Sequence, residues 1–313
     1  MFDCMDKITI LMSTYNGEKY LTEQIDSILA QTYSNWELVI RDDGSSDGTV
    51  QIVDDYVEQE ERVRWFDENE DSSENLGPME SFFLMLETVE SPYYMFCDQD
   101  DVWLPQKIEI TYQEMLEIEV QTAPCLVHTN LIITDSELHA LEKGTREAKD
   151  SMRSLLLTND IVGCTVMINK NLRLFALNDL DSVRVMHDMW LGLLAAQFGV
   201  VSYIGTPSML YRQHTGNVVG KTTGVLAKLR ILNSNGERQR IQTSINAASS
   251  LIQLHGSRLN NEELAYLETV KGFGTEKFTR NLIDMYRNKV HKNSQVATIA
   301  LIVKLAINHN HLK

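Results

Sequence analysis

The feature that most constrains the fold is an alternation of short apolar runs with segments of helical periodicity. Apolar runs at residues 7–12, 36–40 and 92–97 each lead into a polar turn rich in Gly, Ser, Asn or Asp. Helical patterns follow the turns; in residues 20–31, for example, apolar side chains recur at spacings of three and four. Strands that alternate with helices predict an α/β fold with a mostly parallel sheet, whose ligands bind beyond the carboxyl ends of the strands.

The chain changes character near residue 220, after which the pattern is almost wholly helical. We therefore predict an α/β domain over residues 1–220 and a helical C-terminal region over residues 221–313. The first part holds 14 Lys and Arg against 38 Asp and Glu, and the second holds 14 against 6, so their net charges are −24 and +8. The acidic part disfavours nucleic acid as a partner. The positive charge of the C-terminal region favours binding to an anionic surface such as cytoplasmic lipid. The alternative is that this region docks on the acidic part of the chain.

The most apolar helical segment of the C-terminal region is residues 296–307. It is shorter than the roughly 20 residues that span a bilayer, so it predicts either packing, within the chain or in a homo-oligomer, or contact with a membrane surface. The N-terminus lacks a secretory pattern, and no C-x-x-C spacing occurs among the cysteines, so we expect reduced thiols in a cytoplasmic protein. The cysteines are Cys4, Cys97, Cys125 and Cys164.

An acidic cluster, Asp-Gln-Asp-Asp at residues 98–101, directly follows the third apolar run. Carboxylates packed at a strand end repel one another unless a cation or bound protons neutralise them. Oxygen ligands suit Mg²⁺ or Mn²⁺, and a diphosphate is the natural second partner of such a cation. A solvated acidic turn is the alternative that the cluster by itself leaves open.

Three further polar residues each allow two interpretations. Asp43, beyond the second apolar run, can accept the N3–H of a uracil or thymine ring, or it can cap a helix. Asp188 precedes a helical segment whose dipole favours the ionised carboxylate, which can act as a base or merely cap. His214, in a polar loop, can bind a metal or be an ordinary loop histidine. Neither a G-x-G-x-x-G nor a P-loop motif is present, so a metal would have to supply the positive charge for a diphosphate.

Six polar motifs follow one another along the chain, at residues 13–17, 31–33, 42–45, 75–77, 98–101 and 187–190. Their order resembles that of family-2 glycosyltransferases with the GT-A fold, over about residues 7–220. The stretch D-Q-D-D-V-W-L-P-x-K that begins at Asp98 is similar to bacterial rhamnosyltransferases of cell-surface polysaccharide synthesis. The Q-x-x-R-W motif and the membrane spans of processive synthases are missing, so we expect one or a few transfers per encounter.

The resemblance implies a role for each matching residue. The residues implied to bind the nucleotide sugar are Ser13, Tyr15, Asp43, Asp98 and Asp100. Asp98 and Asp100 would also hold the metal, which His214 would complete, and Asp188 matches the catalytic base. The residues implied to lie near the acceptor are Asp101, Asn159, Gly163, Cys164, Thr165 and Trp190.

The activity that the resemblance implies is an inverting transfer that depends on Mn²⁺ or Mg²⁺. A sugar, L-rhamnose from dTDP-L-rhamnose, would move to a hydroxyl of a lipid-linked saccharide at the inner face of the cell membrane. The same reaction with UDP-glucose, UDP-galactose or UDP-N-acetylglucosamine is the alternative. A sugar-nucleotide nucleotidylyltransferase is a weaker one, because its Gly-rich, Arg/Lys-bearing N-terminal signature is missing. A non-catalytic glycan-binding module is disfavoured because Asp98, Asp100, Asp188 and His214 are all present.

Overall fold

The computed structural model describes residues 6–66, 75–143, 151–177, 180–213, 235–292 and 295–308. The chain divides into two compact units. The first comprises Met1–Asp150, Asp160–Leu177 and Leu194–Val218, and the second comprises Ser151–Asn159, Asn178–Leu193 and Val219–Lys313. The second unit thus contains the predicted C-terminal helices together with two earlier segments. The division of function at residue 220 stays a prediction.

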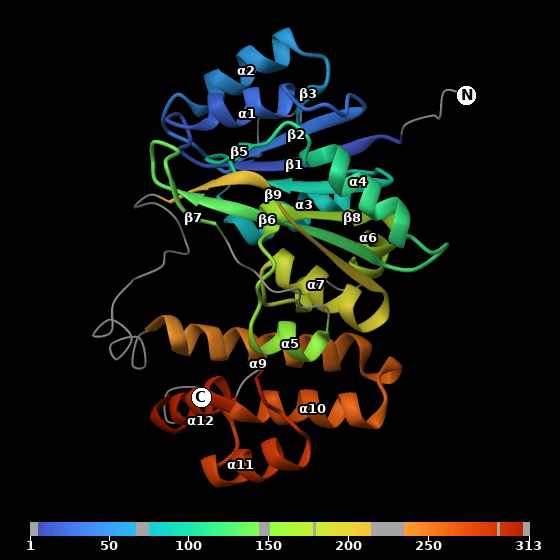
Figure 1. Cartoon of the computed structure of the whole chain (residues 1–313), viewed down its shortest axis with the longest axis vertical. Coiled ribbons are helices and arrows are strands. Elements are labelled where there is room, and N and C mark those ends of the chain that lie inside the picture. Colours follow the sequence, from blue (N-terminus) through green and yellow to red (C-terminus); the bar gives the residue numbers. More distant parts are fainter. Residues whose placement is uncertain are drawn as a thin grey trace. The chain divides into compact units, whose positions relative to one another are not determined.

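The first unit is built on a sheet that has nine strands in the described residues (Figure 1). The strands are β1 (Ile8–Thr14), β2 (Trp36–Asp42), β3 (Val63–Trp65), β4 (Tyr93–Cys97), β5 (Val102–Trp103), β6 (Cys125–Thr134), β7 (Ala140–Lys143), β8 (Val166–Asn169) and β9 (Val200–Arg212). Their order is β3-β2-β1-β4-β8-β6-β9-β5, and β7 pairs with β6. Because β1, β2 and β4 are neighbours and parallel, their carboxyl ends meet at one edge of the sheet.

The sheet is mixed in its pairing. The strands β1 to β4 are parallel to one another, and β9 is parallel to β6. In contrast, β8 runs antiparallel to both β4 and β6, and β5 runs antiparallel to β9. The strand β7 is also antiparallel to β6, as the short connection 135–139 allows. The α/β fold is as predicted, and the parallel arrangement is confined to the first half of the sheet and the β6–β9 pair.

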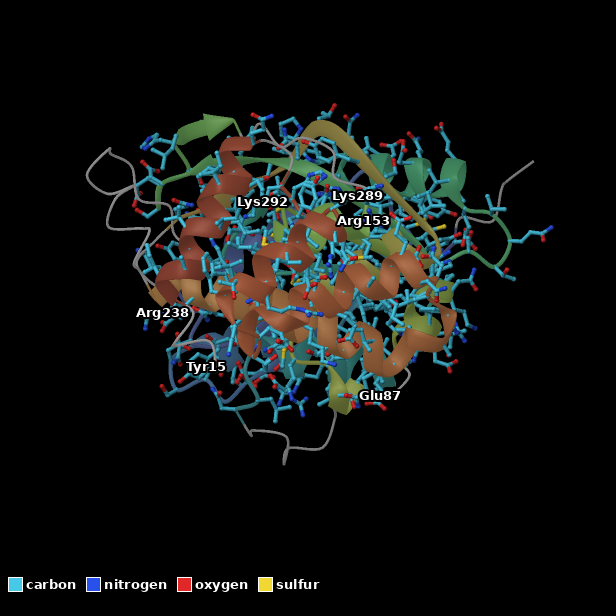
Figure 2. The ribbon with its side chains drawn as sticks, turned by 90° about the horizontal axis from the view of Figure 1, so that it is seen from below. Tyr15, Glu87, Arg153, Arg238, Lys289 and Lys292 are labelled. Atoms are coloured by element: carbon cyan, nitrogen blue, oxygen red, sulfur yellow. The ribbon has the colours of Figure 1, made fainter. Side chains whose placement is uncertain are left out.

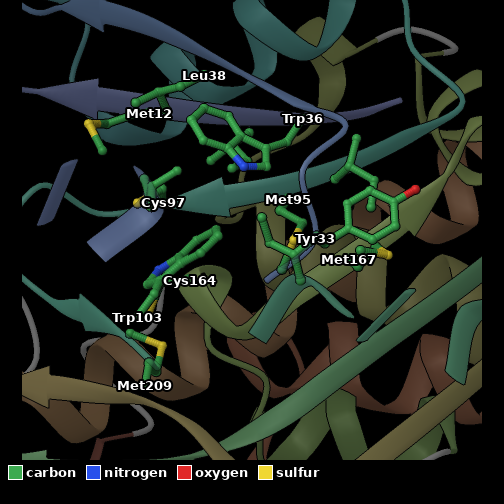
Figure 3. Packing of buried hydrophobic residues seen from close by; sticks show 14 of the residues in the cluster. Met12, Tyr33, Trp36, Leu38, Met95, Cys97, Trp103, Cys164, Met167 and Met209 are labelled. Carbon is green, nitrogen blue, oxygen red and sulfur yellow. The ribbon is translucent and has the colours of Figure 1, made fainter. Parts of the chain in front are cut away.

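One face of the sheet packs against three helices and forms the main core. The helices are α1 (Leu21–Leu29), α2 (Thr49–Gln59) and α4 (Lys107–Ile118). On β1 every second side chain, Ile8, Ile10 and Met12, belongs to this core, because successive strand residues point to opposite faces. Figure 3 shows part of this cluster, including Trp36 and Met167. On α1 the predicted apolar face, with Leu21 among its members, is buried as the spacing requires.

Two further helices of the first unit pack against the sheet. Helix α3 (Pro78–Thr88) packs against β1, and helix α6 (Lys170–Ala176) packs against β8 and β6. Helix α3 begins with a proline at its first position, preceded by Gly77 at a φ of +79°. That left-handed conformation favours glycine and turns the chain sharply into the helix.

The second unit is helical throughout its described residues. Its elements are α5 (Met152–Leu157), the first part of α7 (His187–Phe198), α9 (Asn235–His255), α10 (Asn261–Lys271), α11 (Phe278–Arg287) and α12 (Gln295–Asn308), with short 3₁₀ turns at Leu180–Ser182, Gly256–Arg258 and Gly272–Gly274. Helix α10 starts with a capping box in which Asn260 and Glu263 satisfy each other's backbone N–H groups. Among the described residues, no helix combines the length and the apolarity that crossing a membrane requires.

Candidate active site

The loops that follow β1 and β2 are joined by backbone-to-side-chain hydrogen bonds. The Asn16 N–H donates to Ser45 Oγ at 2.8 Å, and the Ser46 N–H donates to Asn16 Oδ1 at 2.8 Å. One residue further on, the Gly17 N–H donates to Thr49 Oγ1, also at 2.8 Å. Asn16 adopts a positive φ of 49°, a conformation that Asn tolerates better than most residues. The two loops therefore form one framework at the carboxyl edge of the sheet.

The two adjacent carboxylates at the end of β2 have different tasks. Asp42 closes its own turn, accepting hydrogen bonds from Thr14 Oγ1 at 2.8 Å and from the Ser45 N–H at 2.7 Å. Asp43 points inward and is only 3% exposed. Asp42 thus stabilises the turn after β2, whereas the next residue, Asp43, is buried in the interior.

Asp43 connects β2 to the segment before α3. Its carboxylate accepts hydrogen bonds from Arg41 Nη1 at 2.5 Å and from the backbone N–H groups of Leu76 and Gly77, each at 2.8 Å. Burial opposes ionisation, but these donors outweigh it and hold the Asp43 pKa below its ordinary value. Both carboxylate oxygens of Asp43 already accept protein N–H groups, so a nucleobase N–H would be an additional donor to the same carboxylate. Contact between Asp43 and a nucleobase stays a prediction.

The acidic turn after β4 is attached to the turn after β1. The Tyr15 N–H donates to Gln99 Oε1 at 2.8 Å, and Gln99 Nε2 donates to the Tyr15 carbonyl at 3.0 Å. A Cβ at Gly17 would lie 2.3 Å from Gln99 Oε1, so this approach requires glycine. Half of the Tyr15 side chain stays exposed beside the acidic turn. The loops after β1, β2 and β4 therefore converge, as the predicted sheet edge requires.

A group with the composition of a metal site lies in this turn. The ligand atoms of Asp98, Asp101 and Cys164 are all within 4.8 Å of one another. Cys164 comes from the 3₁₀ turn η1 (Gly163–Thr165), which immediately precedes β8. The sequence analysis assigned the metal to Asp98 and Asp100, with His214 as the residue that completes the site. Within the described residues this group contains Asp98 and Asp101, and the Asp100 carboxylate is not part of it.

The charges of this group fit a divalent cation. Asp101 is 1% exposed, and burial together with the nearby carboxylates of Asp98 and Asp100 raises its pKa well above the ordinary value. Burial and the carboxylates of Asp101 and Asp98 raise the pKa of the Cys164 thiol. A cation would relieve this repulsion. Two carboxylates suit Mn²⁺ or Mg²⁺, and the thiol, a softer ligand, favours Mn²⁺ of the two.

Arg212, at the end of β9, fixes the backbone of the acidic turn. Its N–H donates to Asp101 Oδ1 at 3.0 Å and its Nε donates to the Asp100 carbonyl at 2.8 Å. The remaining guanidinium nitrogens bond to the Ser136 carbonyl and to Glu23, each at 2.5 Å. The sequence analysis gave Arg212 no role. Its one signal is that it is a cation in the polar stretch that also contains His214.

The other predicted residues of the first unit lie close to these elements. Ser13 is partly exposed near the end of β1. Gly163, Cys164 and Thr165 are buried in η1, where Thr165 Oγ1 donates to the Val162 carbonyl at 2.7 Å. Their acceptor contacts stay predictions. His214 lies outside the described residues.

The predicted residues of the second unit belong to α5 and α7 or lie near them. Asp188 occupies the first turn of α7, and its Oδ1 accepts from the Met189 N–H at 2.6 Å. The neighbouring His187 is buried, and desolvation lowers its pKa to about 3, so it is neutral. Trp190 is wholly buried, with its ring 6.0 Å from that of His255. Asn159, just after α5, is partly exposed. The roles of Asp188, Trp190 and Asn159 stay predictions.

The mixed sheet, with its acidic turn at the carboxyl end of β4, is a GT-A fold. A crystal structure of S. aureus TarS in complex with UDP-GlcNAc has this fold, with a TM-score of 0.59 and 16% identity over 98% of this chain and 89% of that one. The chain belongs to glycosyl transferase family 2, whose model matches residues 9–174.

Several relatives match half of the chain or more. An uncharacterized glycosyltransferase of Haemophilus influenzae is 31% identical over 53% of this chain and 63% of its own length, so the match leaves out about a third of that protein. The putative teichuronic acid biosynthesis glycosyltransferase TuaG of Bacillus subtilis is 27% identical over 61% of this chain and 73% of that protein. The dTDP-rhamnosyl transferase RfbG of Shigella flexneri is 28% identical over 71% of this chain and 78% of that protein.

Proposed function

We propose that the protein is an inverting glycosyltransferase that moves a sugar from a nucleoside diphosphate donor to an acceptor hydroxyl. Membership of glycosyl transferase family 2 supports this function. The observation that carries it is the convergence of Asp98, Asp101 and Cys164 at the carboxyl end of β4. Two of its members, Asp98 and Asp101, lie in the turn that Gln99 attaches to Tyr15, where a donor diphosphate and its cation would bind.

In the proposed mechanism each residue has one task. Asp98 and Asp101, with Asp100 and His214 as further candidates, would hold a divalent cation. When bound, the cation neutralises charge on the departing diphosphate. Asp188 would accept the proton of the acceptor hydroxyl; its position in the first turn of α7 favours the ionised form. Attack from the face opposite the phosphate would invert the anomeric centre.

The donor that we propose is dTDP-L-rhamnose. The similarity to a dTDP-rhamnosyl transferase and the D-Q-D-D-V-W-L-P-x-K stretch support it. A UDP-hexose is the second candidate, and the GT-A fold of a protein that binds UDP-GlcNAc is the observation in its favour.

Thermal unfolding with nucleotide and Mn²⁺ separates the two donors. We expect dTDP at about 100 times its Kd to raise the Tm by about 5 °C, since ligand binding stabilises the folded state by mass action. UDP at the same concentration is expected to raise the Tm less, and GDP is the mismatched control. A larger shift with UDP would contradict the rhamnose donor. Transfer of labelled rhamnose to a synthetic lipid-linked acceptor then tests the whole reaction.

We propose a lipid-linked saccharide of a cell-surface polysaccharide as the acceptor. Similarity to a putative teichuronic acid biosynthesis glycosyltransferase supports this class. Such an acceptor lies at a membrane, so we further propose that the C-terminal helices bind the cytoplasmic face of the cell membrane. The alternative, a second copy of the chain, is an outcome of the test below.

The surface that we propose for membrane contact consists of the exposed apolar residues of α11 and α12. They are Ile283, Tyr286, Ile299, Val303 and Ile307. Tyr286 is 89% exposed, and the cations Lys289 and Lys292 lie in the connection between the two helices (Figure 2). Apolar residues flanked by Lys suit an anionic lipid surface.

Vesicle flotation tests this surface. The wild-type chain is expected to float with vesicles that contain phosphatidylglycerol and not with pure phosphatidylcholine. The double substitution Ile299→Asp with Val303→Asp should lower the bound fraction at least about tenfold, because both changes place a charge in the apolar layer. The control, Val50→Asp, changes an exposed apolar residue of α2 in the first unit. A concentration-dependent dimer that the double substitution abolishes would instead assign the surface to a second copy.

A further inference from the structure

Gln99, the second residue of the acidic turn, pairs with the backbone of Tyr15. Its Oε1 accepts the Tyr15 N–H at 2.8 Å, and its Nε2 donates to the Tyr15 carbonyl at 3.0 Å. A donor and an acceptor on one partner residue fix the orientation of the amide, much as paired residues fix each other in an antiparallel ladder. One side chain therefore sets the position of the turn after β4 relative to the turn after β1.

Gly17 provides the space that the Gln99 amide occupies. The three atoms that a Cβ at this position would approach most closely all belong to Gln99, and the nearest, Oε1, would be only 2.3 Å away. The φ of Gly17 lies outside the left-handed region, so its backbone does not by itself demand glycine. Because the Gln99 side chain is flexible, a methyl group at Gly17 would push the amide away and break both hydrogen bonds with Tyr15.

These two hydrogen bonds contribute only modestly to the stability of the fold. Tyr15 is half exposed and Gln99 is partly exposed, so water can replace either partner. Water cannot replace the fixed spacing between the two turns. The turn after β1 is already attached on its other side, where the N–H groups of Asn16 and Gly17 donate to the loop after β2. Gln99 thus attaches the acidic turn to a framework that β1 and β2 share.

We propose that Gln99 is a positioning residue that holds the turns after β1 and β4 in one register, so that the nucleoside and the cation of a donor bind as one unit. Tyr15 belongs to the turn expected to bind the nucleoside, and Asp98 and Asp101 belong to the turn expected to bind the cation. A diphosphate that joins the two gains from both turns only when their spacing already matches it, because preorganised sites avoid the cost of ordering on binding. The coupling of nucleotide to cation rests on the proposed function, whereas the interlock of Gln99 with Gly17 and Tyr15 does not.

Two substitutions would break this pair from opposite sides. Gln99→Met keeps the length of the side chain, removes both polar atoms and leaves the charge of the acidic turn unchanged. Gly17→Ala keeps Gln99 but fills the space of its amide. If both substitutions act by opening the same pair, their effects must not add. Two residues that act independently would instead give effects that add.

Hydrogen exchange of the Tyr15 amide tests the interlock in the full chain without ligand. We expect Gln99→Met and Gly17→Ala each to raise the exchange rate of this amide at least about fivefold, because the N–H loses its acceptor. The double variant should exchange within about twofold of the faster single variant. An unchanged rate in Gln99→Met would overturn the proposal, and so would single effects that multiply in the double variant.

The matched controls are Gln51→Met and Gly205→Ala. The Gln51 side chain donates to Asp55 on the surface of α2, and a methyl group at Gly205 in β9 would meet no atom within 4 Å. Both controls should leave the exchange rate of the Tyr15 amide and the affinity for nucleotide unchanged.

Calorimetric titration of dTDP or UDP, with Mn²⁺ and with EDTA in its place, tests the consequence for ligand binding. The ratio of the two Kd values measures how much the cation strengthens nucleotide binding. We expect Gln99→Met and Gly17→Ala each to reduce this ratio at least about fivefold, since groups that orient metal ligands contribute roughly 10- to 100-fold to affinity. The Kd in EDTA should stay within about twofold of the wild type, because the contacts of the nucleoside itself are kept.

The outcomes separate the positioning role from the proposed function. An unchanged ratio in Gln99→Met would overturn the role in coupling. A weaker affinity in EDTA with an unchanged ratio would assign Gln99 to nucleotide binding alone and would also overturn it. If the wild type binds no nucleotide, or binds it equally with Mn²⁺ and with EDTA, the proposed function or its metal dependence fails. The exchange rates of the Tyr15 amide then still decide the interlock.

Discussion

Replacement of Asp188 by Asn is expected to lower turnover by about 10²- to 10⁴-fold, because an amide cannot accept the proton of the acceptor hydroxyl. Nucleotide affinity should stay within about twofold of the wild type, since an amide oxygen can still accept from the Met189 N–H and preserve the start of α7. The measurements are the turnover number at saturating donor and the Kd of the nucleotide by calorimetry.

The control for this substitution is Asp284→Asn. Asp284 is also a helical carboxylate of the second unit, and it pairs with Arg280 on the surface of α11 at 2.6 Å. Its loss should leave turnover unchanged. Normal turnover in Asp188→Asn would rule out Asp188 as the base, whereas a parallel loss of nucleotide affinity would indicate that the residue supports the donor site.

The second large effect is expected at the acidic turn. Asp98→Asn and Asp100→Ala should each weaken Mn²⁺-dependent nucleotide binding by at least about tenfold, because even groups that only support a metal ligand contribute 10- to 100-fold to affinity. Asp98 belongs to the group formed with Asp101 and Cys164, so its substitution should have the larger effect. Calorimetric titration of nucleotide with Mn²⁺, and with EDTA in its place, gives both values.

The control for the acidic turn is Asp135→Asn. Asp135 is an exposed carboxylate of the first unit in the connection between β6 and β7, where it contacts His139. Its substitution should not change the affinity. If nucleotide binds Asp100→Ala as tightly as the wild type in Mn²⁺, Asp100 is not a ligand. If it binds the wild type equally with Mn²⁺ and with EDTA, the proposed metal dependence is wrong.

The long periodic elements of the first unit could be predicted closely. Helical periodicity predicts one helix over residues 78–88 and another over residues 106–119, and the structure has α3 (Pro78–Thr88) and α4 (Lys107–Ile118) there. Both have an apolar stripe that the sheet buries, so periodicity and tertiary packing agree. The segments of the second unit before residue 220 could not be placed this way, because helical periodicity does not say which unit a helix joins.

The strand β5 escaped prediction for a physical reason. It has only the two residues Val102 and Trp103, too few for any periodicity, and it exists because it pairs with Leu210 and Met209 of β9. The apolar run over residues 162–168 predicts one strand. Its first part is the η1 turn, and only β8 (Val166–Asn169) joins the sheet. An apolar run indicates that its residues are buried, and these residues are buried whether they form a strand or a 3₁₀ turn. Hydropathy therefore cannot tell the two conformations apart.

The local sequence determined which carboxylates stand at strand ends, because β1, β2 and β4 are apolar runs that end in polar turns. Their adjacency and parallel direction bring the acidic turn beside Tyr15, as the alternation of strands and helices predicted. Only the tertiary structure decided which two of the three carboxylates, Asp98 and Asp101, lie close to a third ligand residue. Asp101 meets Cys164, which lies 63 positions further along the chain, and Lys107 reaches the other side of the same residue. Such contacts depend on the antiparallel insertion of β8 between β4 and β6, and that pairing is set by long-range packing for which short sequence patterns carry no signal.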